Sequence, residues 1–314
     1  MEKKQINLEK EGAIIYISMT KDGYFALEQL IQAGKKVDLV MTLRNDKSDA
    51  VSDYIDFSTL AVQYNIPIKL VTNVNKEIDY LKSLKPALII VNGWSQLLSE
   101  KIISLPTYGC VGTHPSLLPK NRGRAPIAWH FINEEKFGGI TLFYLDNGCD
   151  SGPIIEQMKF TIFSSDNAQT YYEKITHLGT KLILKNYDKI INGTAISKSQ
   201  NHKKATYLLR RRPKDNLLDF KESTRQIHNK IRAVSGIYPA VYFYYQGNEY
   251  KILSSKLEKL PKYSGVLGQI ARVTDGELWV LAKDGVIILT DVQDKNGNVI
   301  VCTKVFRTGY VINE

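Results

Sequence analysis

The chain of 314 residues has few cysteines and no long apolar run. Its three cysteines, Cys110, Cys149 and Cys302, are odd in number and widely spaced, which argues against a disulfide framework or a zinc site. No run approaches the ~20 uninterrupted apolar residues of a membrane helix. The charged N-terminal segment lacks the apolar core of a signal peptide. These absences predict a cytoplasmic protein that holds no metal and does not associate with a membrane.

A dinucleotide-binding glycine motif is also missing. No G-x-G-x-x-G follows the first apolar run, at 13–18, so a dinucleotide cofactor has no support. Similar β-branched runs recur at 36–43, 68–71 and 86–92, and between them apolar residues stand at helical spacing. This alternation predicts a Rossmann-like α/β domain over residues 1–200, with a mostly parallel sheet covered on both faces. Ligands of such sheets bind at the carboxyl ends of the strands.

Residues 201–314 have a different pattern. Short apolar segments separated by polar or glycine turns predict a small antiparallel β-barrel, similar to an OB fold. One helix is expected in this domain, at 223–234, after a linker at 201–216. The expected strands lie at 241–247, 249–259, 265–274, 277–293 and 301–306.

The formal charge of +10 is concentrated in the second domain. Residues 201–314 carry 19 Lys and Arg against 11 Asp and Glu, whereas residues 1–200 carry 23 against 21. A basic domain attracts RNA or nucleotide phosphates, or it forms only a solvated surface, and its charge does not distinguish these alternatives.

Two segments combine residues that carry chemistry. The loop GTHPSLLPKNRGRAP, at 112–126, places His114 after a short apolar strand. Farther along the chain, an apolar strand at 140–145 runs into a turn that carries Asp146 and Asp150, and Asp150 stands thirty-six residues after this histidine. A carboxylate at the end of one central strand can meet a histidine at the end of its neighbour. Such a pair favours the charged histidine, which stabilises an oxyanion or moves a proton.

These segments, HPSLLPKNRGRAP followed by GITLFYLDNGCDSGPII, resemble the folate-dependent formyltransferase family. That family includes glycinamide ribonucleotide formyltransferase, methionyl-tRNA formyltransferase and the sugar N-formyltransferases. The resemblance spans residues 12–195 and continues in ATYLLRRRPKDNLLDF and IRAVSGIYPAVYFYYQG of the second domain. It implies a formyl donor, 10-formyltetrahydrofolate, and an acceptor with a free amine.

The resemblance also implies catalytic roles. Protonated His114 would stabilise charge on the formyl oxygen, while Asp150 would orient His114 and assist proton transfer from the attacking amine to N10. Gly112 stands where most members have an asparagine that binds the formyl oxygen, and glycine offers only its backbone N–H. The amide of Asn92, after the preceding strand, is a candidate substitute.

The loop NGWSQLL, at 92–98, would form a wall of the pterin pocket, as the corresponding loop does in the family. Trp94 is either a direct ligand contact or an ordinary packed aromatic side chain. The residues expected to contact the folate are Asn92, Gly93, Trp94, Leu97, Ser116, Leu117, Asp146 and Gly148.

Three cations follow the histidine: Lys120, Arg122 and Arg124. Beside a reacting centre they would bind an acceptor that carries phosphates, and otherwise they form a solvated loop. The basic run at 210–212 lies in the linker and is weaker evidence, because basic linkers are common.

Two acceptors fit these features: a nucleotide-linked amino sugar and initiator methionyl-tRNA. The tRNA enzymes share a basic P-A-G-R-G-K insertion after the second strand, where this chain has the short, acidic TLRNDKSDAVSDYIDFSTLA. We therefore expect an amino-sugar N-formyltransferase of a cell-envelope glycan pathway such as lipopolysaccharide, with tRNA an unlikely partner. A folate- or nucleotide-binding relative without catalytic activity is a third alternative. A homodimer through the second domain is compatible with the sequence.

Overall fold

The computed structural model describes residues 12–313, except for the side chains at 49 and 50. The chain divides into two compact units. The first comprises residues up to Pro126 together with Phe137–Thr161 and Tyr172–Leu208. The second comprises Ile127–Lys136, Ile162–Tyr171 and the chain from Leu209 onward. The domain ranges 1–200 and 201–314 stay a prediction.

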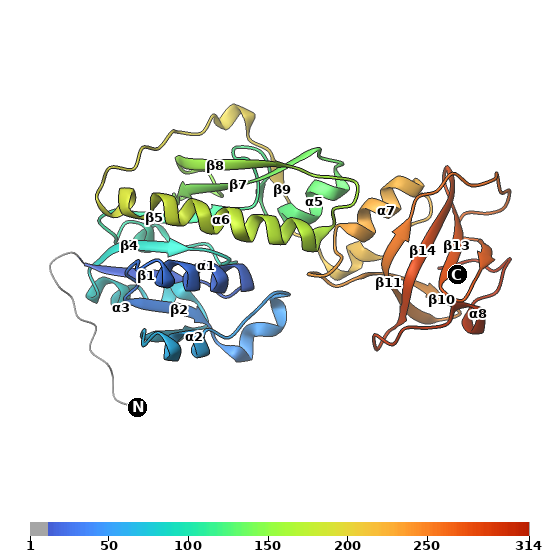
Figure 1. The fold of residues 1–314 in the computed structure, drawn as a ribbon, viewed down its shortest axis with the longest axis horizontal. Coiled ribbons are helices and arrows are strands. Elements are labelled where there is room, and N and C mark those ends of the chain that lie inside the picture. Colours follow the sequence, from blue (N-terminus) through green and yellow to red (C-terminus); the bar gives the residue numbers. More distant parts are fainter. Residues whose placement is uncertain (1–11, 314) are drawn as a thin grey trace. The chain divides into compact units, whose positions relative to one another are not determined.

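The first unit is built on a seven-stranded sheet with the order β3-β2-β1-β4-β5-β7-β8 (Figure 1). The first five strands in this order pair in parallel, and β7 and β8 are antiparallel. This confirms the predicted mostly parallel α/β sheet. The strands are β1 (Ala13–Ile17), β2 (Leu39–Leu43), β3 (Ile68–Val71), β4 (Pro86–Val91), β5 (Cys110–His114), β7 (Phe137–Tyr144) and β8 (Ile154–Thr161).

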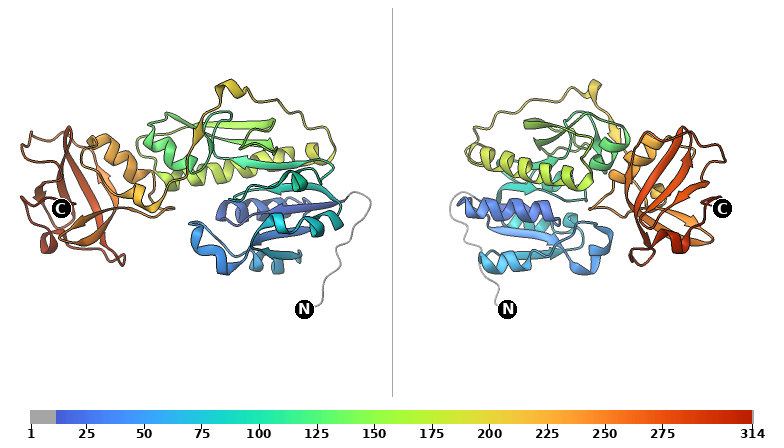
Figure 2. Two further views of the ribbon diagram at one scale, coloured as in Figure 1. Left: turned by 180° about the vertical axis from the view of Figure 1, so that it is seen from behind. Right: turned by 45° about the vertical axis from the view of Figure 1, so that its right-hand side comes forward.

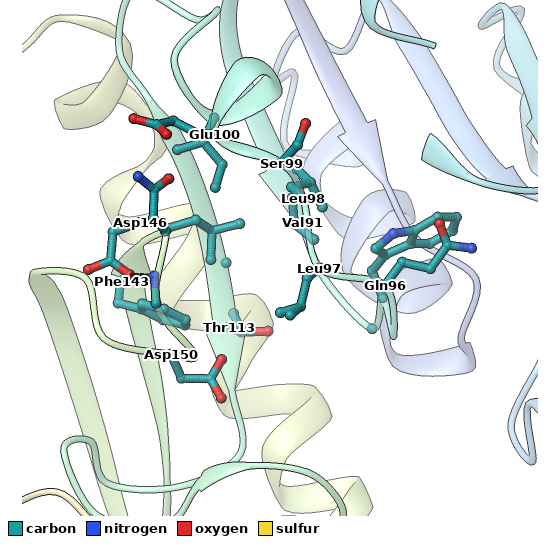
Figure 3. A pocket seen from close by; sticks show the side chains of 17 residues that line it. Val91, Gln96, Leu97, Leu98, Ser99, Glu100, Thr113, Phe143, Asp146 and Asp150 are labelled. Carbon is teal, nitrogen blue, oxygen red and sulfur yellow. Dashed lines mark hydrogen bonds between the residues drawn. The ribbon is translucent and has the colours of Figure 1, made fainter. Parts of the chain in front are cut away.

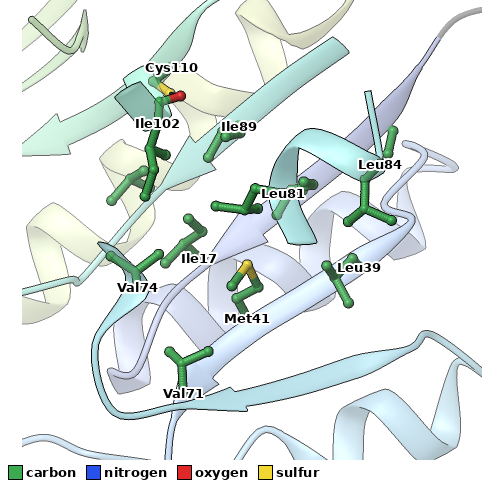
Figure 4. Close-up of a cluster of buried hydrophobic side chains, with 13 residues drawn as sticks. Ile17, Leu39, Met41, Val71, Val74, Leu81, Leu84, Ile89, Ile102 and Cys110 are labelled. Carbon is green, nitrogen blue, oxygen red and sulfur yellow. Dashed lines mark hydrogen bonds between the residues drawn. The ribbon is translucent and has the colours of Figure 1, made fainter. Parts of the chain in front are cut away.

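Helices cover both faces of this sheet because its strands are apolar on both sides. On one face, α1 (Lys21–Gln32) and α6 (Ala168–Ile191) lie side by side in both views of Figure 2. On the other face, α3 (Ile78–Ser83) and α4 (Glu100–Ile103) contribute Leu81 and Ile102 to a buried cluster (Figure 4). The remaining short elements are η1 (Asn45–Ala50), α2 (Ser58–Gln63), η2 (Val74–Lys76), α5 (Pro126–Ile132), η3 (His202–Lys204) and η4 (Pro213–Asn216).

A two-stranded parallel pair lies apart from the main sheet. β6 (Arg122–Gly123) follows the histidine loop, and β9 (Tyr207–Leu208) belongs to the segment that we assigned to the linker. The linker is therefore ordered along the site-bearing loop over part of its length.

The second unit contains a five-stranded antiparallel sheet with the order β10-β11-β14-β13-β12, as the turn pattern predicted. Helix α7 (Thr224–Arg232) packs against β11 and begins at Ser223, whose hydroxyl accepts the N–H of Gln226 in a capping box. The strands are β10 (Val241–Tyr245), β11 (Asn248–Lys256), β12 (Ile270–Val273), β13 (Glu277–Ala282) and β14 (Gly285–Asp294).

The predicted strand at 301–306 is wrong. This segment forms the short helix α8 (Cys302–Val305). Cys302 and Phe306 are buried, whereas Thr303 and Lys304 between them are exposed. Side chains four residues apart lie on the same face of a helix, so burial of this pair favours a helix. The β-branched residues of the segment, which favoured a strand, do not decide its structure.

Between residues 12 and 313, no helix is both long and apolar enough to cross a membrane.

Candidate active site

A cavity of about 390 Å³ lies at the carboxyl ends of β4 and β5. The loop after β4 forms one wall, and the turn after β7 forms the other (Figure 3). Thr113 and Asp150 lie at the same end of this cavity, and Glu100 lies at the other (Figure 3). Its place in the sheet is the one that open α/β folds use for ligands.

His114 and Asp150 are brought together. Nδ1 of His114 lies 3.6 Å from Oδ2 of Asp150, and Nε2 lies 2.7 Å from the carbonyl oxygen of Asn121. A carbonyl only accepts, so Nε2 carries a proton and donates it. His114 is 5% exposed and does not line the cavity, whereas Asp150 does. Of the two side chains, only the carboxylate of Asp150 borders the cavity.

The turn after His114 is fixed by β7 and β8. The hydroxyl of Thr141 donates to the carbonyl of Ser116 at 2.7 Å and accepts the N–H of Leu118 at 3.2 Å. Nε2 of Gln157 donates to the carbonyl of Leu118 at 2.9 Å. These bonds satisfy backbone groups that the irregular turn buries, so they hold the loop rigid.

Gly112 lines the cavity opposite Leu145. A Cβ at Gly112 would lie 3.0 Å from Cδ2 of Leu145 and 3.2 Å from the carbonyl oxygen of Val91. Leu145 thus occupies the space into which a side chain at 112 would extend. The packing of Leu145 therefore fits a residue without a side chain at position 112.

The amide of Asn92 is used elsewhere. Its Oδ1 accepts the hydroxyl of Thr113 at 2.6 Å, and its Nδ2 donates to the Tyr16 hydroxyl at 3.3 Å. Asn92 is buried and is absent from the cavity lining. The hypothesis that Asn92 replaces the family asparagine does not agree with this geometry.

A formyl transferase model matches residues 10–186, and a model of the formyl transferase C-terminal domain matches residues 211–308. The first match covers more than half of the chain and contains both His114 and Asp150. The chain belongs to the formyl transferase family. It is therefore an enzyme that transfers a formyl group, and the family's formyl donor is 10-formyltetrahydrofolate.

Curated relatives of this formyltransferase include the methionyl-tRNA formyltransferase of Thermodesulfovibrio yellowstonii, which is 31% identical over 308 residues, covering 96% of this chain and 97% of that protein. The methionyl-tRNA formyltransferase of Clostridioides difficile is 33% identical over 241 residues, covering 76% of this chain and 77% of that protein. These matches contradict the expectation that tRNA is an unlikely partner. The lack of a P-A-G-R-G-K insertion does not separate the chain from that group, because similarity continues along almost its whole length.

Solved structures of sugar enzymes share the fold. A sugar 3N-formyl transferase studied with dTDP and 5-N-formyl-tetrahydrofolate has a TM-score of 0.67 and 21% identity, covering 92% of this chain and 99% of that chain. The N-formyltransferase of Helicobacter canadensis, in complex with folinic acid and dTDP-3-aminofucose, has a TM-score of 0.66 and 22% identity, covering 89% of this chain and 99% of that chain.

The predicted folate contacts fall into two groups in this formyltransferase. Gly93, Trp94, Leu97, Asp146 and Gly148 line the cavity together with Gly112 and Asp150. Asn92, Ser116 and Leu117 do not. The Ser116 hydroxyl donates to the Lys120 carbonyl at 2.8 Å. Leu117 packs against Gly139, where an added Cβ would lie 2.4 Å from Cδ2 of Leu117. Contact of each predicted residue with folate stays a prediction, and the geometry supports it only for the first group.

Trp94 is placed where either of the two roles that were left open is possible. It packs against the apolar cluster on β1, β2 and β4, and it also lines the cavity. Its Nε1 is buried and has no acceptor within residues 12–313.

The three predicted phosphate contacts have different surroundings. Lys120 and Arg124 are exposed, and Nη1 of Arg124 donates to the Ser95 carbonyl at 2.9 Å. Arg122 is 1% exposed and makes four hydrogen bonds, to Gln200, Tyr207 and His202. The prediction that Arg122 binds phosphate does not agree with its burial.

Sequence reasoning missed Gln200, Asn121 and Thr206, which lie within two hydrogen bonds of the His114–Asp150 pair. Gln200 stands at the end of the range assigned to the first domain, and Thr206 stands in the predicted linker. No spacing or motif singles out Gln200 and Thr206, because their partners are distant in the sequence. Asn121 lies in the loop of His114 and contacts it through a backbone carbonyl, which every residue type has.

Proposed function

We propose that this formyltransferase transfers the formyl group of 10-formyltetrahydrofolate to the amine of a nucleotide-linked amino sugar. The single observation that supports the chemistry best is Asp150, a carboxylate that lines the cavity and is backed by His114. Trp94, Leu97, Asp146 and Gly148 would hold the folate in this cavity, and an amine would approach from the end where Asp150 and Thr113 lie (Figure 3).

Asp150 would move the proton in this reaction. The neutral acceptor amine attacks the formyl carbon, which forms the new C–N bond and places negative charge on the formyl oxygen. Asp150 accepts the proton that the amine releases and returns it to N10 as the C–N10 bond breaks, so no net proton is taken up. His114, whose Nδ1 lies 3.6 Å from Oδ2 of Asp150, would hold the carboxylate in place while this transfer occurs.

The loop between β2 and α2 carries more negative than positive charge. Residues 44–57 carry four aspartates against one arginine and one lysine. The loop folds back on the start of α1, where the carbonyl of Asp53 accepts the N–H of Lys21 at 3.1 Å and its carboxylate accepts the Tyr172 hydroxyl at 2.7 Å. The exposed Lys120 and Arg124 would contact the nucleotide phosphates.

Methionyl-tRNA is the second candidate acceptor. The observation that favours it is the 31% identity over 96% of the chain to a methionyl-tRNA formyltransferase. The basic second unit is compatible with RNA, and nothing in the cavity excludes the amine of an aminoacyl ester.

The test is a direct comparison of acceptors. The protein is incubated with 10-formyltetrahydrofolate and either a panel of dTDP- and UDP-linked amino sugars or methionyl-tRNA, and release of tetrahydrofolate and formylation of each acceptor are measured. We expect turnover with at least one nucleotide sugar and none in Asp150→Asn, the matched control. Efficient formylation of methionyl-tRNA with every sugar inert would overturn the sugar assignment and establish the second candidate.

A further inference from the structure

Residues 200–208, which we call the linker strap, run along the loop that follows His114. β9 of the strap pairs in parallel with β6, and the N–H of Arg122 donates to the carbonyl of Thr206 at 2.9 Å. Gly123 has φ +100°, and a Cβ there would lie 2.5 Å from the carbonyl oxygen of Leu208. Only glycine permits this approach of two backbones, so the contact between strap and loop is built into the sequence.

Buried Arg122 connects the loop to the strap. Nε and Nη2 donate to Oε1 of Gln200 at 3.2 and 2.6 Å, Nη1 donates to the Tyr207 hydroxyl at 3.0 Å, and Nη2 lies 3.2 Å from Nδ1 of His202. In the described part of the chain none of these partners is a carboxylate. The guanidinium therefore fixes the orientation of the Gln200 amide, since Oε1 must face it and Nε2 must point away.

Nε2 of Gln200 points at the turn that carries Asp150. It donates to the carbonyl oxygens of Asp150 at 2.9 Å and Gly152 at 2.7 Å. Asp150 has φ +51°, a conformation that residues with a side chain rarely adopt, so the surrounding bonds must hold it. Its Oδ2 accepts the N–H of Gly123 at 2.7 Å. Both the backbone and the carboxylate of Asp150 are thus fixed by the loop and the strap.

Thr206 fixes the other member of the pair. His114 donates from Nε2 to the carbonyl of Asn121, a residue with φ +59°. The N–H of Asn121 donates to Oγ1 of Thr206 at 2.8 Å, and that hydroxyl donates to Oδ1 of Asn121 at 3.3 Å. The carbonyl that sets the tautomer of His114 is therefore oriented by a strap residue.

We propose that the linker strap positions both members of the His114–Asp150 pair, Asp150 through Arg122 and Gln200 and His114 through Thr206. Gln200, Arg122 and Thr206 are positioning residues, because each acts through another group and does not line the cavity. This inference rests on the proposed function for its kinetic readout, and a second readout without any acceptor separates the two.

The kinetic test uses a matched pair at Thr206, whose side chain is exposed and whose replacement leaves the core intact. Thr206→Val removes the hydroxyl at nearly constant shape, and Thr206→Ser keeps it. We expect kcat to fall about tenfold in Thr206→Val, with the KM for 10-formyltetrahydrofolate within about twofold, and to return within about threefold in Thr206→Ser. Lys214→Ala, an exposed change outside the strap, is the remote control.

Gln200→Glu tests the second arm. Glutamate keeps an acceptor for Arg122 but replaces the amide donor by an oxygen that faces two carbonyls. We expect kcat to fall by about ten- to a hundredfold while binding of 5-formyltetrahydrofolate is retained. The thermal unfolding midpoint of each variant is measured beside the kinetics.

The acceptor-independent readout is the 15N spectrum of the histidines, with the His114 signals assigned by their loss in His114→Gln. The wild-type protein should show His114 protonated at Nε2, and Thr206→Val should shift its signals toward a mixture of tautomers. If no acceptor is turned over but this shift occurs, the proposed function fails and the positioning role stands. Wild-type kcat and spectra in both Thr206→Val and Gln200→Glu, or equal loss in Thr206→Ser and Thr206→Val, would overturn the positioning role.

Discussion

The imidazole of His114 is held between two acceptors, with Oδ2 of Asp150 3.6 Å from Nδ1 and the Asn121 carbonyl 2.7 Å from Nε2. The carbonyl fixes a proton on Nε2. At 3.6 Å, Oδ2 of Asp150 lies within ion-pair range of Nδ1 but beyond the usual distance of a hydrogen bond. A reacting amine would reach this pair through Asp150, because the carboxylate borders the cavity and the imidazole does not.

This geometry predicts that the pair acts as a unit. His114→Ala and Asp150→Ala should each lower kcat by about a hundredfold to ten-thousandfold, because each removes a proton-transferring or charge-stabilising group. The double variant should be little slower than either single one. Turnover of 10-formyltetrahydrofolate measures the effect, with circular dichroism as the check on folding. Near wild-type activity in Asp150→Ala would exclude the proposed role of the carboxylate.

Gly112 gives a second prediction. Gly112→Asn should lower kcat about tenfold, because its Cβ would press on Leu145 at 3.0 Å and on the Val91 carbonyl at 3.2 Å. Adding Leu145→Ala makes room and should recover part of the loss. Comparison of kcat in the single and double variants decides this. A single variant that is faster than the wild-type enzyme would show instead that the site lacks a donor to the formyl oxygen, which the new amide supplies.

Substitutions of the three cations should change different kinetic parameters, KM for Lys120 and Arg124 and kcat for Arg122. Lys120→Ala and Arg124→Ala should raise the KM for a nucleotide-linked acceptor by about three- to tenfold and leave kcat nearly unchanged, since both side chains are exposed and would contact phosphate. Arg122→Ala should lower kcat and the unfolding midpoint, because it leaves the buried Gln200 amide without its donor. Steady-state kinetics at varied acceptor concentration measure both parameters. Equal changes of KM and kcat in all three variants would contradict the prediction.

The second unit should lose stability in mild acid through His228. Burial, followed by the nearby Arg232 and Arg225, lowers the pKa of His228 from 6.5 to about 4. A histidine that is kept neutral by the fold stabilises it above pH 6.5, and this contribution is lost as the pH falls toward 4. The loss should be about 2 kcal/mol after allowance for solvent screening. His228→Gln should flatten the dependence of the unfolding midpoint on pH between 6.5 and 4, and an unchanged slope would contradict the prediction.

Two carboxyl groups, Asp53 in the β2–α2 loop and Asp22 in α1, should change stability in the opposite direction as the pH falls. Removal from water raises the pKa of Asp22 and of Asp53, which share the hydroxyl of Tyr172. Carboxyls whose pKa is raised by the fold stabilise it in acid and cost stability as the pH rises through their folded pKa values. Asp22→Asn should therefore unfold at a higher temperature than the wild-type protein at pH 8, and the difference should shrink at pH 4. A lower midpoint at pH 8 would show that ionised Asp22 is needed.

The alternation of apolar runs was sufficient to predict the sheet of the first unit, because the parallel strands are buried on both faces and read as continuous apolar segments. The segment at 301–306 was misassigned as a strand because its β-branched residues outweigh a helical period that only two buried side chains reveal. A segment of six residues is too short for its apolar residues to distinguish the helical period from the strand period.

For the site, the sequence by itself singled out His114 and Asp150, since both stand in long ordered motifs. The route by which they meet was decided by the tertiary structure. β7 runs antiparallel to β5, so its carboxyl end pairs with the beginning of β5 near Val111, and the turn that follows must bring Asp150 back to His114. Strand direction is set by long-range pairing, which a local pattern does not encode.

Only the folded chain also decided the roles of Arg122 and Arg124. In the sequence they are two equal cations of one loop, but one is buried against Gln200 and the other is exposed. The difference arises because the strap, almost eighty residues farther along the chain, covers one side of the loop and leaves the other in water. Residue type determines what a guanidinium can bind, and burial by a distant segment determines whether a ligand can reach it.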